Sequence, residues 1–267
     1  MSNISGIMTG KRGIIMGVAN ERSIAWGIAQ ALSDAGAELA FTYQGEAFEK
    51  RIRPLADSVG STVVLKCDVE DNDSVQLVFD QLSTVWNSLD FIVHSIAYSD
   101  KDELNGRYVD TTPENFTRTM NISCFSFTAV AKAAFSLMAK SGGSIVTLTY
   151  YGAERVLPNY NIMGVAKAAL EASVKYLAAD LGPDKIRVNA ISAGPMRTLA
   201  GSAIGGARKI YNISEANAPL RQSVTQEQLG ATARYLLSDM GGGVTGEIHH
   251  VDAGYNIVGM PYVTNNE

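Results

Sequence analysis

Short apolar runs alternate along the chain with longer segments that have helical periodicity. Seven of these runs are apolar on both faces and rich in β-branched residues, a pattern typical of strands in a parallel sheet that is covered on both sides. The predicted strands are Gly13–Gly17, Leu39–Tyr43, Val63–Lys66, Phe91–Ser95, Ser144–Thr149, Arg187–Ser192 and Ile248–Val251. Between the first two strands, Ile24, Ile28 and Leu32 have the four-residue spacing of a helix packed on a sheet.

The alternation of strands and helices continues to the end of the chain without a linker. It predicts one α/β domain over residues 1–267, built on a Rossmann-like, doubly wound parallel sheet of about seven strands with helices on both faces. Residues 199–219 interrupt the regularity, with three glycines and no strand pattern directly after a predicted strand end. Ligands of such sheets bind outside the carboxyl ends of the strands, so this segment is interpreted as a substrate-binding lid. The alternative is a plain surface excursion.

Composition narrows the classes of function. The 267 residues include 22 Lys and Arg against 27 Asp and Glu, a formal charge of −5, which argues against a nucleic-acid partner. Cys67 and Cys124 form no disulfide framework, so a reducing cytoplasm is the simplest interpretation. The N-terminus has no secretory pattern and no apolar stretch reaches about 20 residues, so we expect no membrane association. The most apolar segment, Cys124–Ala139, is predicted to be a buried helix.

The first strand runs into a turn suited to a phosphate group. Gly17 allows a close backbone approach, and Ser23 is placed to cap a helix that begins at Ile24, with a hydroxyl that could also reach a phosphate oxygen. Gly27 is expected to let this helix lie close to the sheet. The spacing Gly-x5-Ser-x3-Gly is weak evidence alone, and an unliganded strand–turn–helix remains the alternative. The chain lacks the lysine motif of nucleotide triphosphatases.

The next two strand ends bear on the choice of cofactor. The second strand is followed by Gln44, Gly45 and Glu46, which offer no cation to a 2′-phosphate and favour NADH over NADPH, unless Lys50 or Arg51 reaches back. The third strand ends at Asp68, whose carboxylate could accept a hydrogen bond from an adenine amino group. Capping of the following helix is an equally good interpretation of Asp68.

A tyrosine and a lysine follow the fifth strand. Pro158 suits the start of a helix, and Tyr160 and Lys167 are then two helical turns apart on one face. A phenol can donate a hydrogen bond to an oxygen on which negative charge develops, and a nearby lysine can hold a cofactor ribose and bias the phenol. Tyr and Lys often meet on helix faces, so the spacing alone is weak evidence.

The chain resembles the bacterial enoyl-acyl-carrier-protein reductases of the short-chain dehydrogenase/reductase superfamily over essentially its whole length. The motifs that carry this resemblance are Gly17-x5-Ser23-x3-Gly27, Cys67-Asp68-Val69, His94-Ser95-Ile96-Ala97-Tyr98, Tyr150 with Gly-Ala-Glu-Arg, Tyr160-x6-Lys167 and the segment Arg187–Thr198. Tyr-x6-Lys, in place of the Tyr-x3-Lys of the wider superfamily, is the most specific of them. Ala97 stands where relatives often carry Gly, and Tyr151 where others often carry Leu.

The resemblance implies that NADH reduces a trans-2-enoyl thioester carried by acyl carrier protein, in the last step of the fatty-acid elongation cycle, in a homotetramer. It implies a catalytic set of Tyr150, Tyr160 and Lys167, and leaves open whether Tyr160 or a water relay protonates the α-carbon. The cofactor-binding residues expected are Gly17, Ser23, Ile24, Gln44, Asp68, Val69, Ser95, Ile96, Lys167 and Thr198. The substrate-binding residues expected are Ala97, Tyr98, Tyr150, Tyr160, Met163, Met196, Ala200 and Ile204.

Two other functions compete with this hypothesis. A carbonyl reductase of the same superfamily should have an amine four residues after the tyrosine, where this chain has Gly164. A non-catalytic dinucleotide sensor should lack Tyr160 or Lys167, and both are present. No metal is expected, because His249 and His250 are adjacent on a predicted strand and point to opposite faces.

Overall fold

The computed structural model describes residues 6–202 and 206–260. All seven predicted strands are present, each to within one residue at either end. They are β1 (Arg12–Met16), β2 (Glu38–Tyr43), β3 (Val63–Lys66), β4 (Phe91–His94), β5 (Gly143–Thr149), β6 (Ile186–Ala193) and β7 (Ile248–Val251). The helices are α1 (Ile24–Asp34), α2 (Glu46–Ser58), α3 (Asn72–Val85), α4 (Pro113–Met120), α5 (Ser126–Met138), α6 (Asn161–Leu181), α7 (Leu199–Ser202), α8 (Ala207–Asn217) and α9 (Gln226–Leu237).

The strands form one parallel sheet in the order β3-β2-β1-β4-β5-β6-β7. The chain leaves β1 in one direction along the sheet and returns at β4 to continue in the other. The neighbours β1 and β4 therefore mark the point at which the strand order reverses, where an open α/β sheet forms its ligand crevice. This topology confirms the predicted doubly wound fold.

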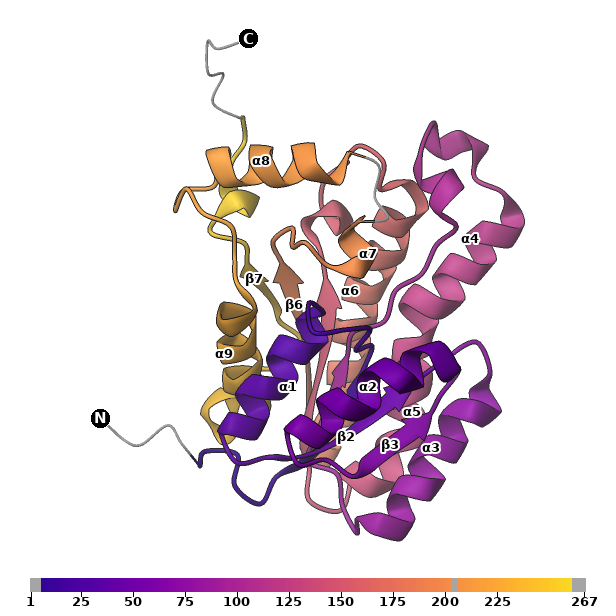
Figure 1. Ribbon diagram of the computed structural model, residues 1–267, viewed down its shortest axis with the longest axis vertical. Coiled ribbons are helices and arrows are strands. Elements are labelled where there is room, and N and C mark those ends of the chain that lie inside the picture. Colours follow the sequence, from indigo (N-terminus) through magenta and orange to yellow (C-terminus); the bar gives the residue numbers. More distant parts are fainter. Residues whose placement is uncertain (1–5, 203–205, 261–267) are drawn as a thin grey trace.

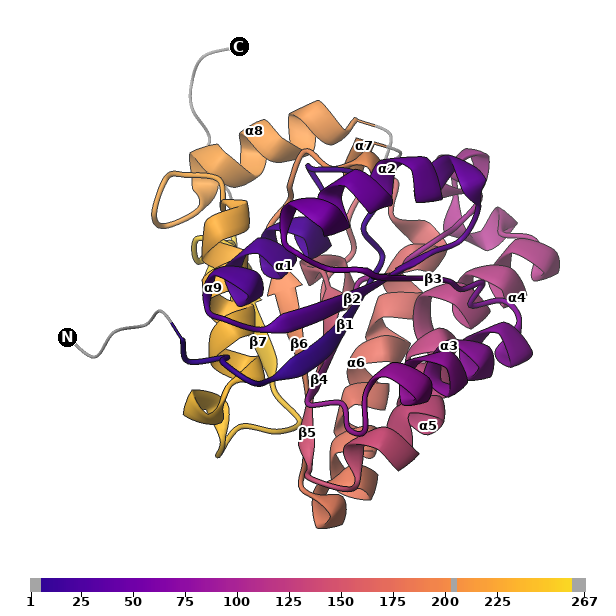
Figure 2. The same ribbon diagram turned by 60° about the horizontal axis from the view of Figure 1, so that its bottom comes forward.

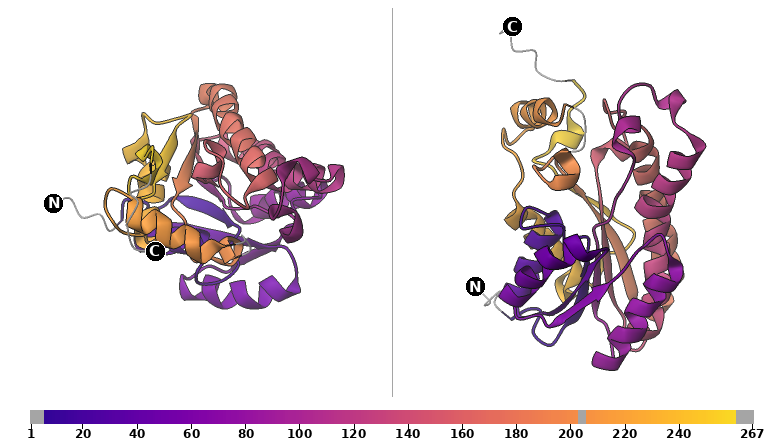
Figure 3. Two further views of the ribbon diagram at one scale, coloured as in Figure 1. Left: turned by 90° about the horizontal axis from the view of Figure 1, so that it is seen from above. Right: turned by 45° about the vertical axis from the view of Figure 1, so that its right-hand side comes forward.

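Helices cover both faces of the sheet (Figures 2 and 3). On one face, α3, α5 and α6 pack over Ile14 and Ile92, and on the other, α1, α2 and α9 pack over Ile15 and Val93. All four of these strand side chains are fully buried. Neighbouring residues of one strand thus enter different cores, which explains why the strands read as continuous apolar runs.

The predicted apolar helix at Cys124–Ala139 is part of a longer one. Helix α4 runs through a π-helical turn, η3 (Asn121–Phe125), into α5, so that the helix is continuous from Pro113 to Met138. Its length and composition would allow it to cross a membrane, but 56% of its most apolar 18-residue window is buried inside the protein. The helix is therefore a core element of the described fold.

Helices α7 and α8 lie beyond the carboxyl ends of the strands (Figure 1). They occupy the segment for which the sequence predicted a lid. The turns that follow β1, β3, β4, β5 and β6 reach the same edge of the sheet, and they supply most of the site described next.

Candidate active site

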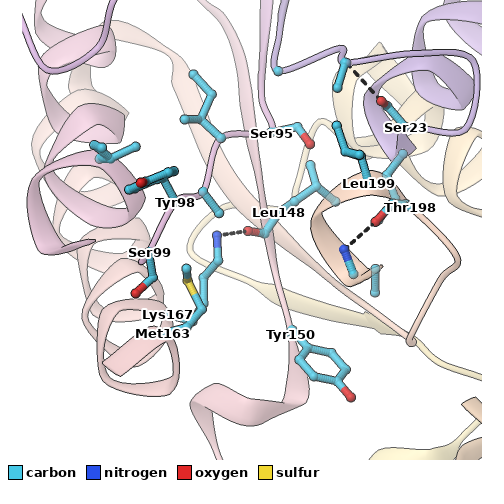
Figure 4. A pocket seen from close by; sticks show the side chains of 18 of the residues that line it. Ser23, Ser95, Tyr98, Ser99, Leu148, Tyr150, Met163, Lys167, Thr198 and Leu199 are labelled. Atoms are coloured by element: carbon cyan, nitrogen blue, oxygen red, sulfur yellow. Dashed lines mark hydrogen bonds between the residues drawn. The ribbon is translucent and has the colours of Figure 1, made fainter. Parts of the chain in front are cut away.

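A cavity of about 680 Å³ opens at the carboxyl edge of the sheet. Its volume is in the range of cofactor and substrate sites. Its lining includes every residue predicted for the site whose side chain the structure describes, namely Gly17, Ser23, Ile24, Gln44, Asp68, Val69, Ser95, Ile96, Ala97, Tyr98, Tyr150, Tyr160, Met163, Lys167, Met196 and Thr198. In the close-up, Tyr98 and Ser99 lie on one side of the cavity and Thr198 and Leu199 on the other, with Lys167 and Leu148 between them (Figure 4). The topology thus brings together groups that are far apart in the sequence.

The turn after β1 is held tightly against the end of β4. Gly17 has a φ of 97°, and a Cβ there would collide with the carbonyl oxygen of Ser95. Only glycine suits this backbone and this close approach. The turn brings the first residues of α1 to the cavity, where the positive end of the helix dipole favours a phosphate group.

Two expectations about this turn are wrong. Ser23 occupies the position before α1, but its hydroxyl does not cap that helix: it accepts hydrogen bonds from the backbone N–H groups of Ala19 and Asn20 at 3.0 and 3.1 Å. Because the loop curls back over Ser23, its upstream amides are nearer than those of the helix. Gly27 does not face the sheet but packs against α9, where a Cβ would lie 2.6 Å from Cβ of Gln226.

The structure decides between the two interpretations of Asp68. The cap of α3 is Asp71, whose side chain accepts from the backbone N–H of Asp73 at 2.9 Å. Asp68 lies at the cavity wall, and its Oδ1 accepts from the backbone N–H of Glu70 at 3.1 Å. The capping interpretation of Asp68 is therefore wrong, while adenine recognition by its carboxylate stays a prediction.

Tyr160 is the residue directly before the first residue of α6, not a residue inside the helix. The helix begins at Asn161, not at Pro158, because Asn159 and Asn161 have positive φ values of 60° and 34° and the chain turns between them. Tyr160 is nevertheless buried, with its ring edge-on to that of Tyr150 at 5.3 Å between centroids. Burial raises the pKa of both phenols, so both remain protonated hydrogen-bond donors at neutral pH.

Lys167 is buried on the first turns of α6, and its Nζ donates to the backbone carbonyl of Leu148 at 2.8 Å (Figure 4). Burial lowers the pKa of this ammonium group to about 8, while the nearby Cys124 and Glu171 oppose the shift. Lys167 is thus cationic at neutral pH but loses its charge only slightly above it. A buried lysine with a strongly lowered pKa in a cleft is typical of a residue in a functional site.

His94 ends β4 beneath this site and is fully buried. Its Nδ1 lies 3.0 Å from Oγ1 of Thr147, and its Nε2 lies 2.9 Å from Oγ of Ser126. Burial, with a smaller effect from the charge of Lys167, lowers its pKa to about 3. The neutral ring therefore joins β4, β5 and α5 by hydrogen bonds.

In the described part of the chain, neither His249 nor His250 belongs to a cluster of possible metal ligands. His250 Nε2 lies 2.7 Å from Oε1 of Glu154. Over residues 6–202 and 206–260, no group of three or more His, Cys, Asp or Glu side chains is placed to hold a metal ion.

The segment after β6 covers part of the cavity. Thr198 Oγ1 accepts from the backbone N–H of Gly201 at 2.9 Å, and the Tyr211 hydroxyl donates to the carbonyl of Met196 at 2.8 Å. Leu199 and Tyr211 line the cavity. Of the two substrate contacts expected here, Ile204 lies outside the described residues, and for Ala200 only the backbone, in α7, is described.

Several lining residues were missed by sequence reasoning. They are Tyr43, Phe48, Glu70, Leu104, Arg118, Leu148 and Tyr211. The helical periodicity of residues 207–217 could have indicated Tyr211 on an inward face, but Arg118 and Glu70 are brought together only by the packing of α4 beside the β3–α3 turn. Cys67, expected to be a small buried residue, is buried and also lines the cavity, and burial raises its thiol pKa to about 12.

The site has the parts that a dinucleotide-dependent oxidoreductase requires: a tight glycine turn at a helix N-terminus, a carboxylate at the third strand, and a buried Tyr and Lys at the reversal point of a parallel sheet. Residues 17–256 match the family model described as enoyl-(acyl carrier protein) reductase. The chain belongs to this family.

Individual relatives are similar over nearly the whole length. The protein is 61% identical over 263 residues to an NADH enoyl-acyl-carrier-protein reductase of Rhizobium meliloti, covering 98% of this chain and 96% of that one. The structure of an Anaplasma phagocytophilum enoyl reductase in complex with NAD has a TM-score of 0.94 and 57% identity, covering 97% of this chain and 98% of that one. A Bacillus cereus enoyl reductase with NADP+ and indole naphthyridinone has a TM-score of 0.93 and 51% identity, covering 95% and 99%.

Proposed function

We propose that this protein reduces the trans-2 double bond of enoyl thioesters carried by acyl carrier protein, with NADH as the hydride donor, in the last step of the fatty-acid elongation cycle. The observation that carries the proposal is the buried pair Tyr160 and Lys167 in one cavity, seven residues apart as in this family. The Rhizobium meliloti relative is named an NADH enoyl-acyl-carrier-protein reductase, and the Anaplasma phagocytophilum structure is a complex with NAD.

The cavity fits a dinucleotide. The turn at Gly17, which only glycine can make so close to the end of β4, brings the start of α1 to the cavity as a place for the pyrophosphate, and Asp68 is a partner for the adenine amino group. Lys167 would hold the nicotinamide ribose, and Ser95 and Thr198 would complete the contacts. When bound, the cofactor supplies a hydride to the β-carbon of the enoyl thioester.

The residues of the chain then handle the charge that develops on the substrate. Tyr160, kept protonated by burial, donates a hydrogen bond to the thioester carbonyl oxygen as it becomes an enolate oxygen. The cation of Lys167 favours this negative charge and orients the ribose. A proton delivered to the α-carbon, from Tyr160 or through a water relay, completes the saturated thioester. Tyr150, edge-on to Tyr160, lines the part of the cavity that would hold the thioester and excludes water from it.

The end of β2 supports NADH as the cofactor. Gln44 lines the cavity, and neither Lys50 nor Arg51 does. The residues that line this end of the cavity, Tyr43, Gln44 and Phe48, offer no cation to a 2′-phosphate.

Residues 199–219 act as a substrate-binding lid on a single dinucleotide-binding domain spanning residues 1–267. In support, Leu199, Ile210 and Tyr211 contribute apolar surface to the cavity, as an acyl chain needs. Two hydrogen bonds join this segment to the site: Gly201 N–H donates to Thr198, expected to contact the cofactor, and the Tyr211 hydroxyl donates to the carbonyl of Met196, expected to contact substrate.

The enzyme works in the cytoplasm as a homotetramer. Both cysteines are free and buried, as suits a reducing compartment. Large apolar side chains are exposed along one helical layer, which favours burial against further copies of the chain. They are Phe116, Phe125, Phe135, Val165 and Tyr176. Light scattering on the purified protein should give the mass of four chains, and a monomeric mass would contradict this assembly.

The proposed reaction is tested by incubating the protein with NADH and a crotonyl thioester and following the absorbance band of NADH. We expect consumption of NADH and formation of the saturated thioester. Reduction of ketones or aldehydes without enoyl reduction would instead indicate a carbonyl reductase. NADH binding without turnover of any of these substrates would indicate a sensor.

A further inference from the structure

A network of ionic and aromatic contacts joins α4 to the loops that follow β3 and β4 at the rim of the cavity. Arg118, on α4, makes a bidentate pair with Glu70, with Nε to Oε1 and Nη2 to Oε2 both at 3.0 Å. The same guanidinium lies over the ring of Tyr98, 4.5 Å from its centroid. Asp100 accepts from the Tyr98 hydroxyl at 2.9 Å and lies 3.9 Å from Arg118. The bidentate pair, the stacked ring and the hydroxyl bond to Asp100 together hold the Tyr98 side chain at the rim.

The main chain of Tyr98 is fixed separately. Its backbone N–H donates to Oγ of Ser123, and the same hydroxyl donates to its carbonyl oxygen, both at 2.9 Å. Ser123 belongs to the π-helical turn η3, and such turns are frequent at functional sites because they redirect side chains within a helix. The backbone position of Tyr98 is therefore held without Arg118, whereas its ring is held by the stacked guanidinium of Arg118 together with the hydrogen bond to Asp100.

The network spans both halves of the cavity. Glu70, Tyr98 and Arg118 all contribute to its lining. Glu70 donates its backbone N–H to the carboxylate of Asp68, and so continues the wall on the predicted adenine side. Tyr98 lies on the opposite side of the cavity from Thr198 and Leu199 (Figure 4), on the wall predicted to contact substrate.

We propose that Arg118 is a positioning residue: held by Glu70, it fixes the ring of Tyr98 and thereby determines how tightly the cavity binds the acyl chain of the enoyl substrate. This inference rests on the proposed reduction of enoyl thioesters. Isolated ion pairs at a surface contribute little, but a bidentate arginine that also stacks on an aromatic ring is constrained in both distance and plane. Lysine cannot reproduce this geometry, because its ammonium is a point charge without a planar fork.

The test compares the wild type with Arg118→Lys. Steady-state kinetics with crotonyl and dodecenoyl thioesters give KM and kcat, and calorimetry gives the affinity for NADH. Loss of a stacked guanidinium should raise KM for the dodecenoyl substrate about three- to fivefold. The KM of the short crotonyl substrate, kcat and NADH affinity should change much less, because no reacting atom loses a partner.

Two further variants separate positioning from a general structural effect. Arg12→Lys makes the same substitution in an exposed arginine that forms a single hydrogen bond to Glu38 at the amino ends of β1 and β2, far from the site, and should leave all parameters at their wild-type values. In a Tyr98→Ala background, Arg118→Lys should raise KM no further, because the ring through which Arg118 acts is absent.

Each other outcome overturns the inference. Weaker NADH binding in Arg118→Lys would make Arg118 a cofactor contact. Unchanged kinetics would reduce the pair to an ordinary surface ion pair, and an equal effect with and without the Tyr98 ring would remove Tyr98 from the argument. If the wild type reduces neither thioester, the proposed function itself fails, and the inference falls with it. The wild-type assay alone shows a failure of the proposed function, whereas only the variants can show a failure of the inference about Arg118.

Discussion

The rings of Tyr150 and Tyr160 meet edge to face, at 5.3 Å between centroids and 80° between planes. Both side chains line the cavity, but Tyr160 is buried whereas Tyr150 is partly exposed. Burial raises the pKa of both phenols, so both could donate a hydrogen bond to a substrate oxygen. We assign the hydrogen-bond donor to Tyr160 and a lining role to Tyr150, and substitution of each residue can distinguish these two roles.

Tyr160→Phe should retain NADH affinity and slow enoyl reduction by on the order of a hundredfold or more, because only the developing oxyanion loses a donor. Its matched control is Tyr150→Phe, which keeps the aromatic contact and removes the neighbouring hydroxyl. Single-turnover kinetics and calorimetry on both variants measure the difference. An unchanged rate in Tyr160→Phe, with a slow Tyr150→Phe, would reverse the two assignments.

Lys167 should give NADH binding a pH dependence. The pKa of this buried ammonium is lowered to about 8, so its charge is present below that value and is lost as pH rises through it. If the charged amine holds the ribose, NADH affinity is full near neutral pH and falls toward pH 9. Lys167→Arg stays charged and should flatten this profile, whereas Lys167→Ala should bind NADH weakly at every pH. Wild-type affinity in Lys167→Ala would contradict the assignment.

NADH should be preferred over NADPH. The residues after β2 present Gln44 to the cavity and Glu46 nearby, which would repel a 2′-phosphate. Comparison of kcat/KM for the two cofactors measures the preference, and Gln44→Arg should shift it toward NADPH by supplying a cation. Equal turnover with NADPH in the wild type would indicate that Lys50 or Arg51 reaches back.

His94 should contribute to acid sensitivity. Its pKa is lowered to about 3 in the fold, whereas the unfolded chain binds its proton near pH 6.5, so unfolding takes up a proton in between. Stability from this residue is therefore complete above pH 6.5 and is lost as the pH falls, by up to about 1.4 kcal/mol per pH unit. Urea unfolding of wild type and His94→Gln at several pH values should show a shallower decline in the variant. Parallel declines would mean that other groups dominate.

The amides of α8 should exchange slowly only once the site is filled. If residues 199–219 form a lid, hydrogen exchange in α8 is fast in the free protein and slow with NADH and an acyl ligand. Helices α5 and α6 serve as internal references and should be protected throughout. Protection of α8 in the free protein would indicate a preformed wall rather than a lid.

The strands were predictable because each carries apolar side chains into two cores, as Ile14 and Ile15 do on neighbouring positions of β1. Strands with apolar side chains on both faces can be recognised from their own sequence, without information from the rest of the chain. The cavity was predictable for the same reason: in a parallel sheet, residues at the carboxyl ends of strands must converge on one edge.

Local turns were less predictable. Pro158 suits a helix start, yet the positive φ of Asn159 delays α6 to Asn161, and the sequence pattern is compatible with both. The hydroxyl of Ser23 can accept from either side, and the curl of the loop toward Ala19 decides. Arg118 and Glu70 are 48 positions apart, so no local pattern could have paired them.

The central claim is tested most directly by the fate of a labelled hydride. The protein is incubated with NADH deuterated at nicotinamide C4 and a crotonyl thioester, and the product is analysed by mass spectrometry and NMR. We predict a saturated butyryl thioester carrying deuterium on its β-carbon, with formation slowed by on the order of a hundredfold in Tyr160→Phe. Recovery of unchanged crotonyl thioester, or deuterium at the carbonyl carbon of a reduced aldehyde or alcohol, would contradict enoyl reduction by this site.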